Sequence, residues 1–218
     1  KRRPLPPFAW MMLQPPLLML IFTVVFSALF RGGTPHYEIY FLSAYVAWNF
    51  FAQTTINAMA SVAWNGPLMK RVRVPQTIFT LAIVVAGLVN LGLSLALLFA
   101  IMLAAGAPLH GALWFLPIAV LLAGLFTLGV SLALTAVSIL FADVREMVQA
   151  GMPALLYLTP IIYPIAIVPE RYRWMIKLNP LVYIVETVRD PIYYGILPSP
   201  ATLSLAAVLS FGSLAVGW

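Results

Sequence analysis

Five polar residues recur at every fourth position within a long uncharged stretch of the chain. They are Asn49, Gln53, Asn57, Ser61 and Asn65. Because an α-helix turns once in about 3.6 residues, this spacing predicts a polar stripe that winds slowly around one helix. An amide without a partner in an apolar medium costs on the order of several kcal/mol. The stripe must therefore face a neighbouring helix, another subunit or a wet cavity, and the spacing alone leaves helix packing and channel lining both open.

The residue types that carry out catalysis or ion transport lie outside the long apolar stretches. His36 and His110 fall in predicted loops, and every Asp, Glu, Lys and Arg lies near the end of an apolar stretch, which disfavours a proton or sodium relay. The sequence has no cysteine, no G-x-x-x-x-G-K-[ST] phosphate loop and no H-E-x-x-H zinc pair. We therefore expect no catalytic residue, no metal site and no cofactor in this chain. Energy for uphill transport would come from a partner.

The composition predicts a membrane protein. Of 218 residues, 63% are hydrophobic and 8% are charged, whereas a soluble domain is about 25% charged. Uncharged stretches cover residues 4–30, 39–69, 74–142, 147–169 and 191–218, and each exceeds the roughly 20 residues that span a bilayer. Glycine and proline at 106–111 predict a turn within the third stretch. The predicted fold is an all-α integral membrane protein with six transmembrane helices, in one domain (1–218) that we expect to be trimmed at both ends.

Proline residues predict irregular helices in two of these stretches. Pro15 and Pro16 lie in the first stretch, and Pro153, Pro160 and Pro164 lie in the fourth stretch, which is the fifth predicted span. An interior proline removes a backbone hydrogen bond, which membrane helices tolerate where neighbouring groups repair the backbone. We therefore expect the fifth span to be bent.

The basic residues indicate an orientation. With six spans, both termini share one side of the membrane with the loops at 63–76 and 141–147. That side carries more basic residues than the other, so the positive-inside rule places both termini in the cytoplasm. The basic residues of the cytoplasmic side are Lys1, Arg2, Arg3, Lys70, Arg71, Arg73 and Arg145, and those of the other side are Arg31, Arg171, Arg173, Lys177 and Arg189.

The segment from about 170 to 195 is too polar to span a membrane but has helical periodicity. Asn179 and Pro180 supply an N-cap and a first-turn proline between two short helices, and Asp190-Pro191 ends the second. The apolar face comprises Leu181, Ile184, Val185 and Val188, and residues typical of the headgroup level are Tyr172, Trp174, Tyr183, Tyr193 and Tyr194. We expect a helical hairpin at the outer membrane surface, with a simple interfacial anchor as the alternative.

A short basic segment lies between the second and third predicted helices. It comprises Asn65, Gly66, Pro67, Leu68, Met69, Lys70, Arg71, Val72, Arg73, Val74 and Pro75. Its position between two long helices is suited to contact with an energy-supplying partner. A loop that only sets the topology explains the same composition.

Several sequence blocks cover nearly the whole chain. They are residues 13–15 (LQP), 19–26 (MLIFTVVF), 48–51 (WNFF), 65–75, 141–145 (FADVR), 159–164 (TPIIYP) and 168–180. In these blocks and in their order the chain resembles the ABC-2 type export permeases of the polysaccharide exporter family, which are transmembrane subunits of O-antigen, capsular polysaccharide and teichoic acid exporters.

This resemblance implies a homodimer in the bacterial cytoplasmic (inner) membrane that binds two copies of an ABC ATPase. ATP and Mg²⁺ would bind the ATPase, and the coupling helix that contacts it would map onto 65–75. An extracytoplasmic gate hairpin would cover 168–197, before the last helix. Its candidate residues are Glu170, Arg171, Trp174, Asn179, Pro180 and Tyr183. Family members also begin with a cytoplasmic amphipathic helix that this sequence lacks.

Aromatic and amide side chains are the candidates for a sugar path. Aromatic faces and amide hydrogen bonds let a long glycan slide, whereas fixed charges would hold it. From the helices that line the channel in similar proteins, the candidates are Trp10, Asn49, Phe51, Gln53, Tyr157 and Tyr163. For each aromatic residue, packing or an interfacial position is the alternative.

The function implied by the resemblance is ATP-driven export of a lipid-linked polysaccharide, as in O-antigen export for lipopolysaccharide biosynthesis. The alternatives are an ABC-2 permease for a small drug or lipid, a passive channel or scramblase, and a membrane-embedded glycan enzyme. The acidic cluster that an enzyme would use is limited to Asp143 and Glu146 beside Arg145, and a helix-end salt bridge explains it more simply. Nothing indicates a nucleic acid partner.

Overall fold

The computed structural model describes residues 17, 19–21, 24, 36–71, 75–141 and 143–218, without the side chains of 63–71 and 76. Within this part of the chain every regular element is helical, which confirms the all-α class. The elements are α2 (Tyr37–Arg71), α3 (Gln76–Ala104), η1 (Gly111–Phe115), α4 (Leu116–Leu140), α5 (Asp143–Leu158), η2 (Ile165–Ile167), α6 (Glu170–Lys177), α7 (Pro180–Arg189), the π-helical turn η3 (Asp190–Tyr194) and α8 (Pro200–Gly217).

Three helical segments of the described chain are long and apolar enough to cross a membrane. They are Thr77–Ala104, Gly111–Leu140 and Pro200–Gly217. The predicted turn at 106–111 separates the first two, and Gly106 adopts the left-handed backbone (φ 68°) that glycine accommodates most easily. The six-span count stays a prediction, because most of 4–30 lies outside the described residues.

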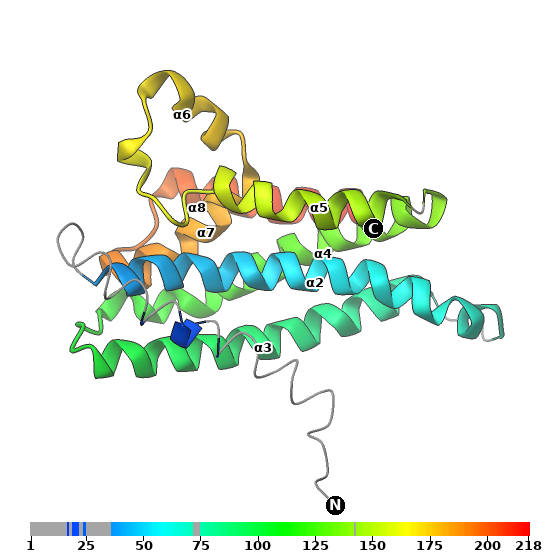
Figure 1. The fold of residues 1–218 in the computed structure, drawn as a ribbon, viewed down its shortest axis with the longest axis horizontal. Coiled ribbons are helices and arrows are strands. Elements are labelled where there is room, and N and C mark those ends of the chain that lie inside the picture. Colours follow the sequence, from blue (N-terminus) through cyan, green and yellow to red (C-terminus); the bar gives the residue numbers. More distant parts are fainter. Residues whose placement is uncertain (1–16, 18, 22–23, 25–35, 72–74, 142) are drawn as a thin grey trace, which may run out of the picture.

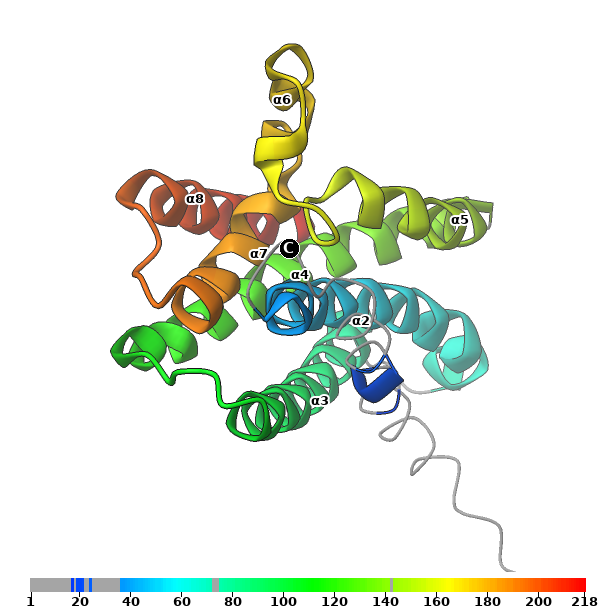
Figure 2. The same ribbon diagram turned by 60° about the vertical axis from the view of Figure 1, so that its left-hand side comes forward.

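The long helices lie side by side, with α2 near the centre of the bundle. Helix α2 packs against α3 and α4, and α4 packs along α8. Helix α7 lies against α2, α4 and α8, whereas α6 projects away from the bundle in both views (Figure 1, Figure 2).

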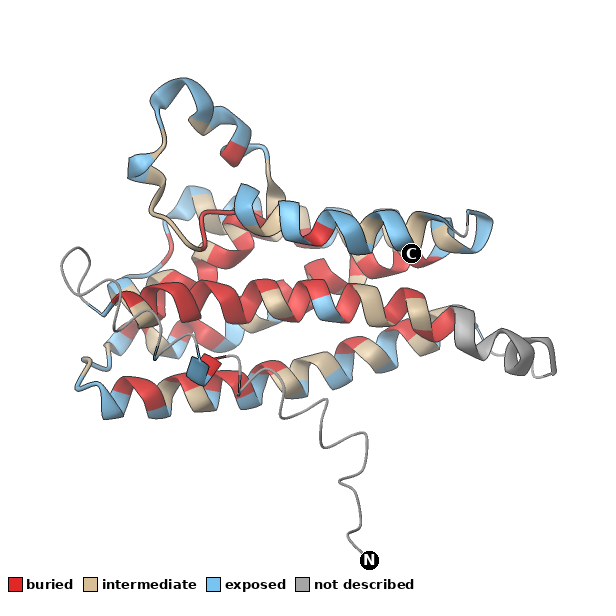
Figure 3. Ribbon diagram, viewed as in Figure 1, coloured by how far each residue is buried: buried red, intermediate tan, exposed pale blue. Residues whose placement is uncertain are grey.

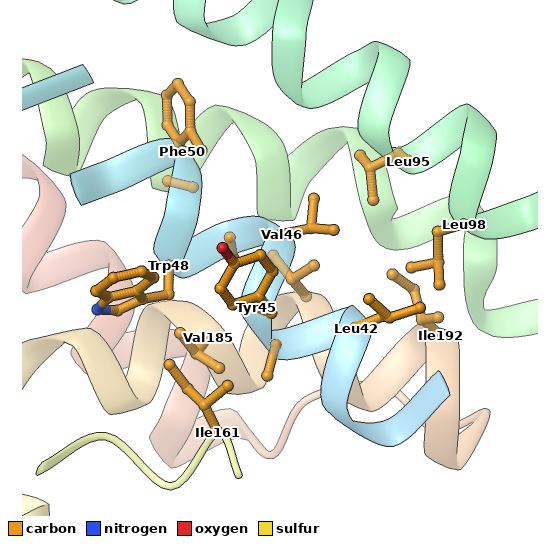
Figure 4. Close-up of a cluster of buried hydrophobic side chains, with 14 of the residues drawn as sticks. Leu42, Tyr45, Val46, Trp48, Phe50, Leu95, Leu98, Ile161, Val185 and Ile192 are labelled. Carbon is orange, nitrogen blue, oxygen red and sulfur yellow. The ribbon is translucent and has the colours of Figure 1, made fainter. Parts of the chain in front are cut away.

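The core forms around α2, because this helix is apolar on most of its circumference. Its buried side chains, such as Leu42 and Trp48, share one cluster with Leu98 of α3, Val185 of α7 and Ile161 after α5 (Figure 4). Figure 3 shows α2 buried along most of its described length. The core therefore connects the bundle to the chain segments on both sides of α6.

The fifth predicted span differs from expectation. Helix α5 ends at Leu158 instead of bending and continuing toward 169, and Pro153 lies inside it. Pro160 and Pro164 lack the N–H groups that would continue the helix, which explains the early end. With 16 residues, α5 is about 24 Å long, shorter than the roughly 30 Å hydrocarbon core.

Small residues bring α4 and α8 into close contact. A Cβ atom at Gly129 would overlap the backbone of Ser213 and Leu214. Across the same seam, the Ser210 hydroxyl donates to the Leu122 carbonyl oxygen at 3.0 Å. Glycine thus permits backbone contact of the kind that stabilises helix pairs in membranes.

We expect Gly129→Leu to lower the stability of the bundle by about 2 kcal/mol, because the added side chain forces α4 and α8 apart. Thermal unfolding of the purified protein measures this loss. The matched control is Gly92→Leu on α3, where a Cβ atom would meet nothing within 4 Å. Equal melting temperatures for the two variants would contradict the close contact.

Candidate functional site

An amide strip lies on the side of α2 that the described part of the chain does not bury. Between residues 39 and 62, nearly all side chains of α2 are buried. Gln53 is exposed, and Asn49 and Asn57 are half-buried. We call these three residues the α2 amide strip. Three side chains that the sequence predicts to face a partner or a wet cavity are thus left open, beside the half-buried Ile56 and Ala60.

The polar stripe does not stay on this side of the helix. Each four-residue step rotates the stripe by about 40°, because four residues exceed one turn. Ser61 is buried accordingly, and its hydroxyl donates to the Ala58 carbonyl oxygen at 2.8 Å. Asn65 belongs to the helical backbone of α2, and its side chain lies outside the described part. The predicted stripe therefore has an open strip at 49–57 and a buried position at Ser61.

The aromatic candidates occupy different environments. Phe51 is 5% exposed, and its ring centroid lies 5.6 Å from that of Phe126 on α4, so it packs the core in this conformation. Tyr157 is exposed at the end of α5, and the Tyr163 hydroxyl donates to its carbonyl oxygen at 2.7 Å. The fold thus brings Tyr157 and Tyr163 together. Trp10 lies outside the described residues.

The predicted coupling segment is partly described. The backbone of α2 remains helical through Arg71, and Pro75 precedes α3 as its N-cap residue. Residues 72–74 and the side chains of 65–71 lie outside the described part. The end of α2 thus supplies a helical backbone over much of the segment.

The helix pair α6–α7 has the predicted cap between its two helices but not the predicted end of the second. The Asn179 side chain accepts a hydrogen bond from the Leu181 N–H at 3.1 Å, and Pro180 occupies the first turn of α7. All four predicted apolar-face residues of α7 are buried. Asp190-Pro191 does not stop the helical path, which continues as η3.

The other hairpin candidates lie on or beside the exposed α6. Glu170 pairs with Arg173 at 3.7 Å, and Trp174 is exposed. The Arg171 guanidinium carbon lies 4.4 Å from the ring centroid of Tyr172. The Tyr183 hydroxyl donates to the Lys177 carbonyl oxygen at 2.8 Å, linking α7 to the end of α6.

Side chains from α2 and α7 donate to the backbone of residues 160–163, the break after α5. The Arg189 Nη2 donates to the Pro160 carbonyl oxygen at 2.6 Å. The Tyr40 hydroxyl donates to the Tyr163 carbonyl oxygen at 3.2 Å, and the Tyr37 hydroxyl donates to that of Ile162. The Arg189 donor replaces the backbone bond that Pro164 cannot make, and the two tyrosine hydroxyls supply donors to carbonyl groups of the non-helical segment after α5.

Arg189 is the centre of this network. It is 4% exposed, its Nη1 donates to the Tyr40 hydroxyl at 3.1 Å, and its guanidinium carbon lies 4.3 Å from the Tyr40 ring centroid. A cation over an aromatic face gains up to about 2 kcal/mol when desolvated. Tyr40 thus contributes both a hydroxyl and a ring face to a buried charge.

Three charged residues share the end of α7. Burial raises the pKa of Asp190 to about 6, and Arg189 opposes that shift. Burial raises the pKa of Glu186 as well, and the charge of Asp190 adds to this effect. Burial lowers the pKa of Arg189. Among the described residues no ion pair within 4 Å joins these three groups. The hydrogen bonds of Arg189 go to the Tyr40 hydroxyl oxygen and the Pro160 carbonyl oxygen.

Sequence reasoning did not identify Tyr37, Tyr40 and Arg189 as partners of the break. A usable signal is the four-residue spacing of Pro160 and Pro164, because Pro164 lacks the N–H that would reach the Pro160 carbonyl in a helix. That spacing indicates a carbonyl in need of a donor. It does not indicate which donor comes from elsewhere in the fold.

The chemistry available on the described site is hydrogen bonding and ring contact. The α2 amide strip offers neutral donors and acceptors, and the exposed Tyr157 offers a ring face. The described residues include no cluster of three or more His, Cys, Asp or Glu that could hold a metal ion.

Comparison with known proteins shows the family of this chain. Residues 1–193 match the family of ABC-2 type transporters. The chain is 25% identical over 191 residues to the O-antigen export system permease protein RfbA of Klebsiella pneumoniae, covering 87% of this chain and 74% of the relative. It is 25% identical over 205 residues to the protein of the same name from Myxococcus xanthus, covering 93% and 79%. The family match spans most of the apolar helices, and the chain therefore belongs to the ABC-2 type transporter family.

Proposed function

We propose that this chain is the transmembrane subunit of an ABC exporter that moves a lipid-linked polysaccharide across the bacterial inner membrane. The chain supplies the conduit, and a separate ATPase subunit binds ATP with Mg²⁺ and supplies the energy. Two copies of the chain and two copies of the ATPase form the transporter, with the termini of the chain in the cytoplasm.

The α2 amide strip is the observation that supports this proposal most directly. Lipid offers no hydrogen-bond partner to Asn49, Gln53 and Asn57, so the open side of α2 must meet water, cargo or protein. Neutral amides can bond to sugar hydroxyls without attracting a fixed charge. The similarity to O-antigen export permeases supports a glycan as the cargo.

The coupling and gate roles complete the proposal. The end of α2 and the residues up to Pro75 contact the ATPase, because this segment is basic in sequence and connects α2 to α3. The α6–α7 pair covers the outer exit of the conduit, where its exposed aromatic residues meet the headgroup level.

Co-purification of the full-length protein with a candidate ABC ATPase tests the proposal, followed by ATPase assays in nanodiscs with and without lipid-linked glycan. We expect a complex of two plus two subunits whose ATP hydrolysis responds to the glycan. A complex that responds only to small lipids or drugs would contradict the glycan cargo. Failure to bind any ATPase would exclude the exporter and favour a channel, scramblase or enzyme.

We expect Gln53→Leu to reduce glycan export by about five-fold, because one amide hydrogen bond contributes about 1 kcal/mol. Export into sealed vesicles containing the complex measures this effect. The control is Asn90→Leu, which removes a half-buried amide from α3. Equal export by the two variants would remove Gln53 from the conduit.

We expect Arg71→Glu or Arg73→Glu to lower glycan-stimulated ATP hydrolysis by about tenfold, since a reversed charge at an interface opposes association. Membrane insertion should be unchanged, because the new charge lies outside the hydrocarbon. The controls are Arg71→Lys and Arg73→Lys, which keep the charge and should retain coupling. Normal coupling in both glutamate variants would show that these arginines lie outside the ATPase interface.

A further inference from the structure

The break after α5 needs a donor that its own backbone lacks. In a continued helix the N–H of residue 164 would bond to the carbonyl oxygen of residue 160, but Pro164 has no N–H. Arg189 Nη2 donates to this carbonyl oxygen at 2.6 Å. The guanidinium group of Arg189, at the end of α7, therefore takes the place of the missing backbone donor.

Both ends of α7 are attached to the start of this break. At the first end, the Asn179 side-chain amide donates to the Thr159 hydroxyl oxygen at 2.9 Å. At the other end, Arg189 holds the adjacent Pro160 and is itself held by Tyr40 of α2. The buried apolar face of α7 packs on the bundle between these two attachments. Helix α7 is thus fixed to α2 and to the end of α5.

Helix α6 has a different environment. Ile176 is its one buried residue, and Figure 3 shows most of the helix exposed. The hydrogen bonds of Arg173 stay local, from its Nε to the Val168 carbonyl oxygen at 2.9 Å and from its Nη2 to that of Ala166 at 3.4 Å. Segments with few buried contacts are the ones that move at low free-energy cost.

We propose that Arg189 is a positioning residue that fixes α7 on the bundle, so that the moving part of the α6–α7 pair is residues 164–178. The importance of this motion for export rests on the proposed function. The attachment of α7 is independent of the proposed function, since it follows from contacts within one chain.

Distances between spin labels test the proposal, because residues 1–218 contain no cysteine that would compete with introduced pairs. Leu93→Cys on α3 is the common reference position in the full-length protein in nanodiscs. The second labels are Tyr172→Cys on α6, Ile196→Cys after η3, and Val208→Cys on α8. Each of these four positions is exposed.

Without nucleotide, we expect Arg189→Gln to widen the 93–196 distance distribution by about twofold, since α7 loses one of its two attachments. The 93–208 distribution should not change, whereas a general loss of structure would widen it. The matched control is Arg173→Gln, which removes arginine-to-carbonyl bonds near α6 and should leave 93–196 unchanged. If Arg189→Gln does not fold, Tyr40→Phe removes the hydroxyl that accepts from Arg189 and keeps the ring.

With the ATPase bound, we expect ATP to shift the 93–172 distance by roughly 5 Å, the scale of one helical turn, and to leave 93–196 in place. An unchanged 93–196 distribution in Arg189→Gln, or in Tyr40→Phe where the arginine variant does not fold, would overturn the proposal. An equal shift of both distances with ATP would also overturn it. If no ATPase binds, the proposed function fails, and the nucleotide-free comparison still decides the role of Arg189.

Discussion

Backbone carbonyl groups in an apolar protein need hydrogen-bond donors, and this requirement shapes the region where α5 ends. Helix α5 ends at Leu158, and Pro164 has no N–H for the Pro160 carbonyl oxygen, so the carbonyl groups of 160–163 need donors from outside a regular helix. Arg189, Tyr40 and Tyr37 fill this role from α7 and α2. A buried guanidinium costs several kcal/mol unless it is well bonded. Here the carbonyl oxygen, the Tyr40 hydroxyl and the Tyr40 ring offset that cost.

This network decides how the adjacent helices relate to each other. Because α7 is held at Asn179 and at Arg189, it belongs structurally to the bundle, although it follows the projecting α6 in the chain. The close contact of α4 and α8 at Gly129 provides another part of the same scaffold. Helix α6 is attached through short connections and local hydrogen bonds. The α6–α7 pair thus combines a fixed helix and an exposed helix.

Helix α2 has two functions in this arrangement. Its buried side chains build the core, and Tyr40 anchors the break after α5. Its uncovered side displays the α2 amide strip. One rigid helix therefore links the proposed conduit surface, the network around Arg189 and, through its end at Arg71, the proposed coupling segment.

The sequence by itself determined the membrane class, the turn at 106–111, and the cap and buried face of α7, because these depend on composition and local periodicity. Spacing also indicated the polar stripe. Only the tertiary structure decided that Gln53 lies open while Ser61 and Phe51 are buried, since neighbouring helices determine which side of α2 is covered. Likewise, Arg189 reaches Pro160 through folding, because a bond between residues far apart in the chain leaves no periodic signal in the sequence.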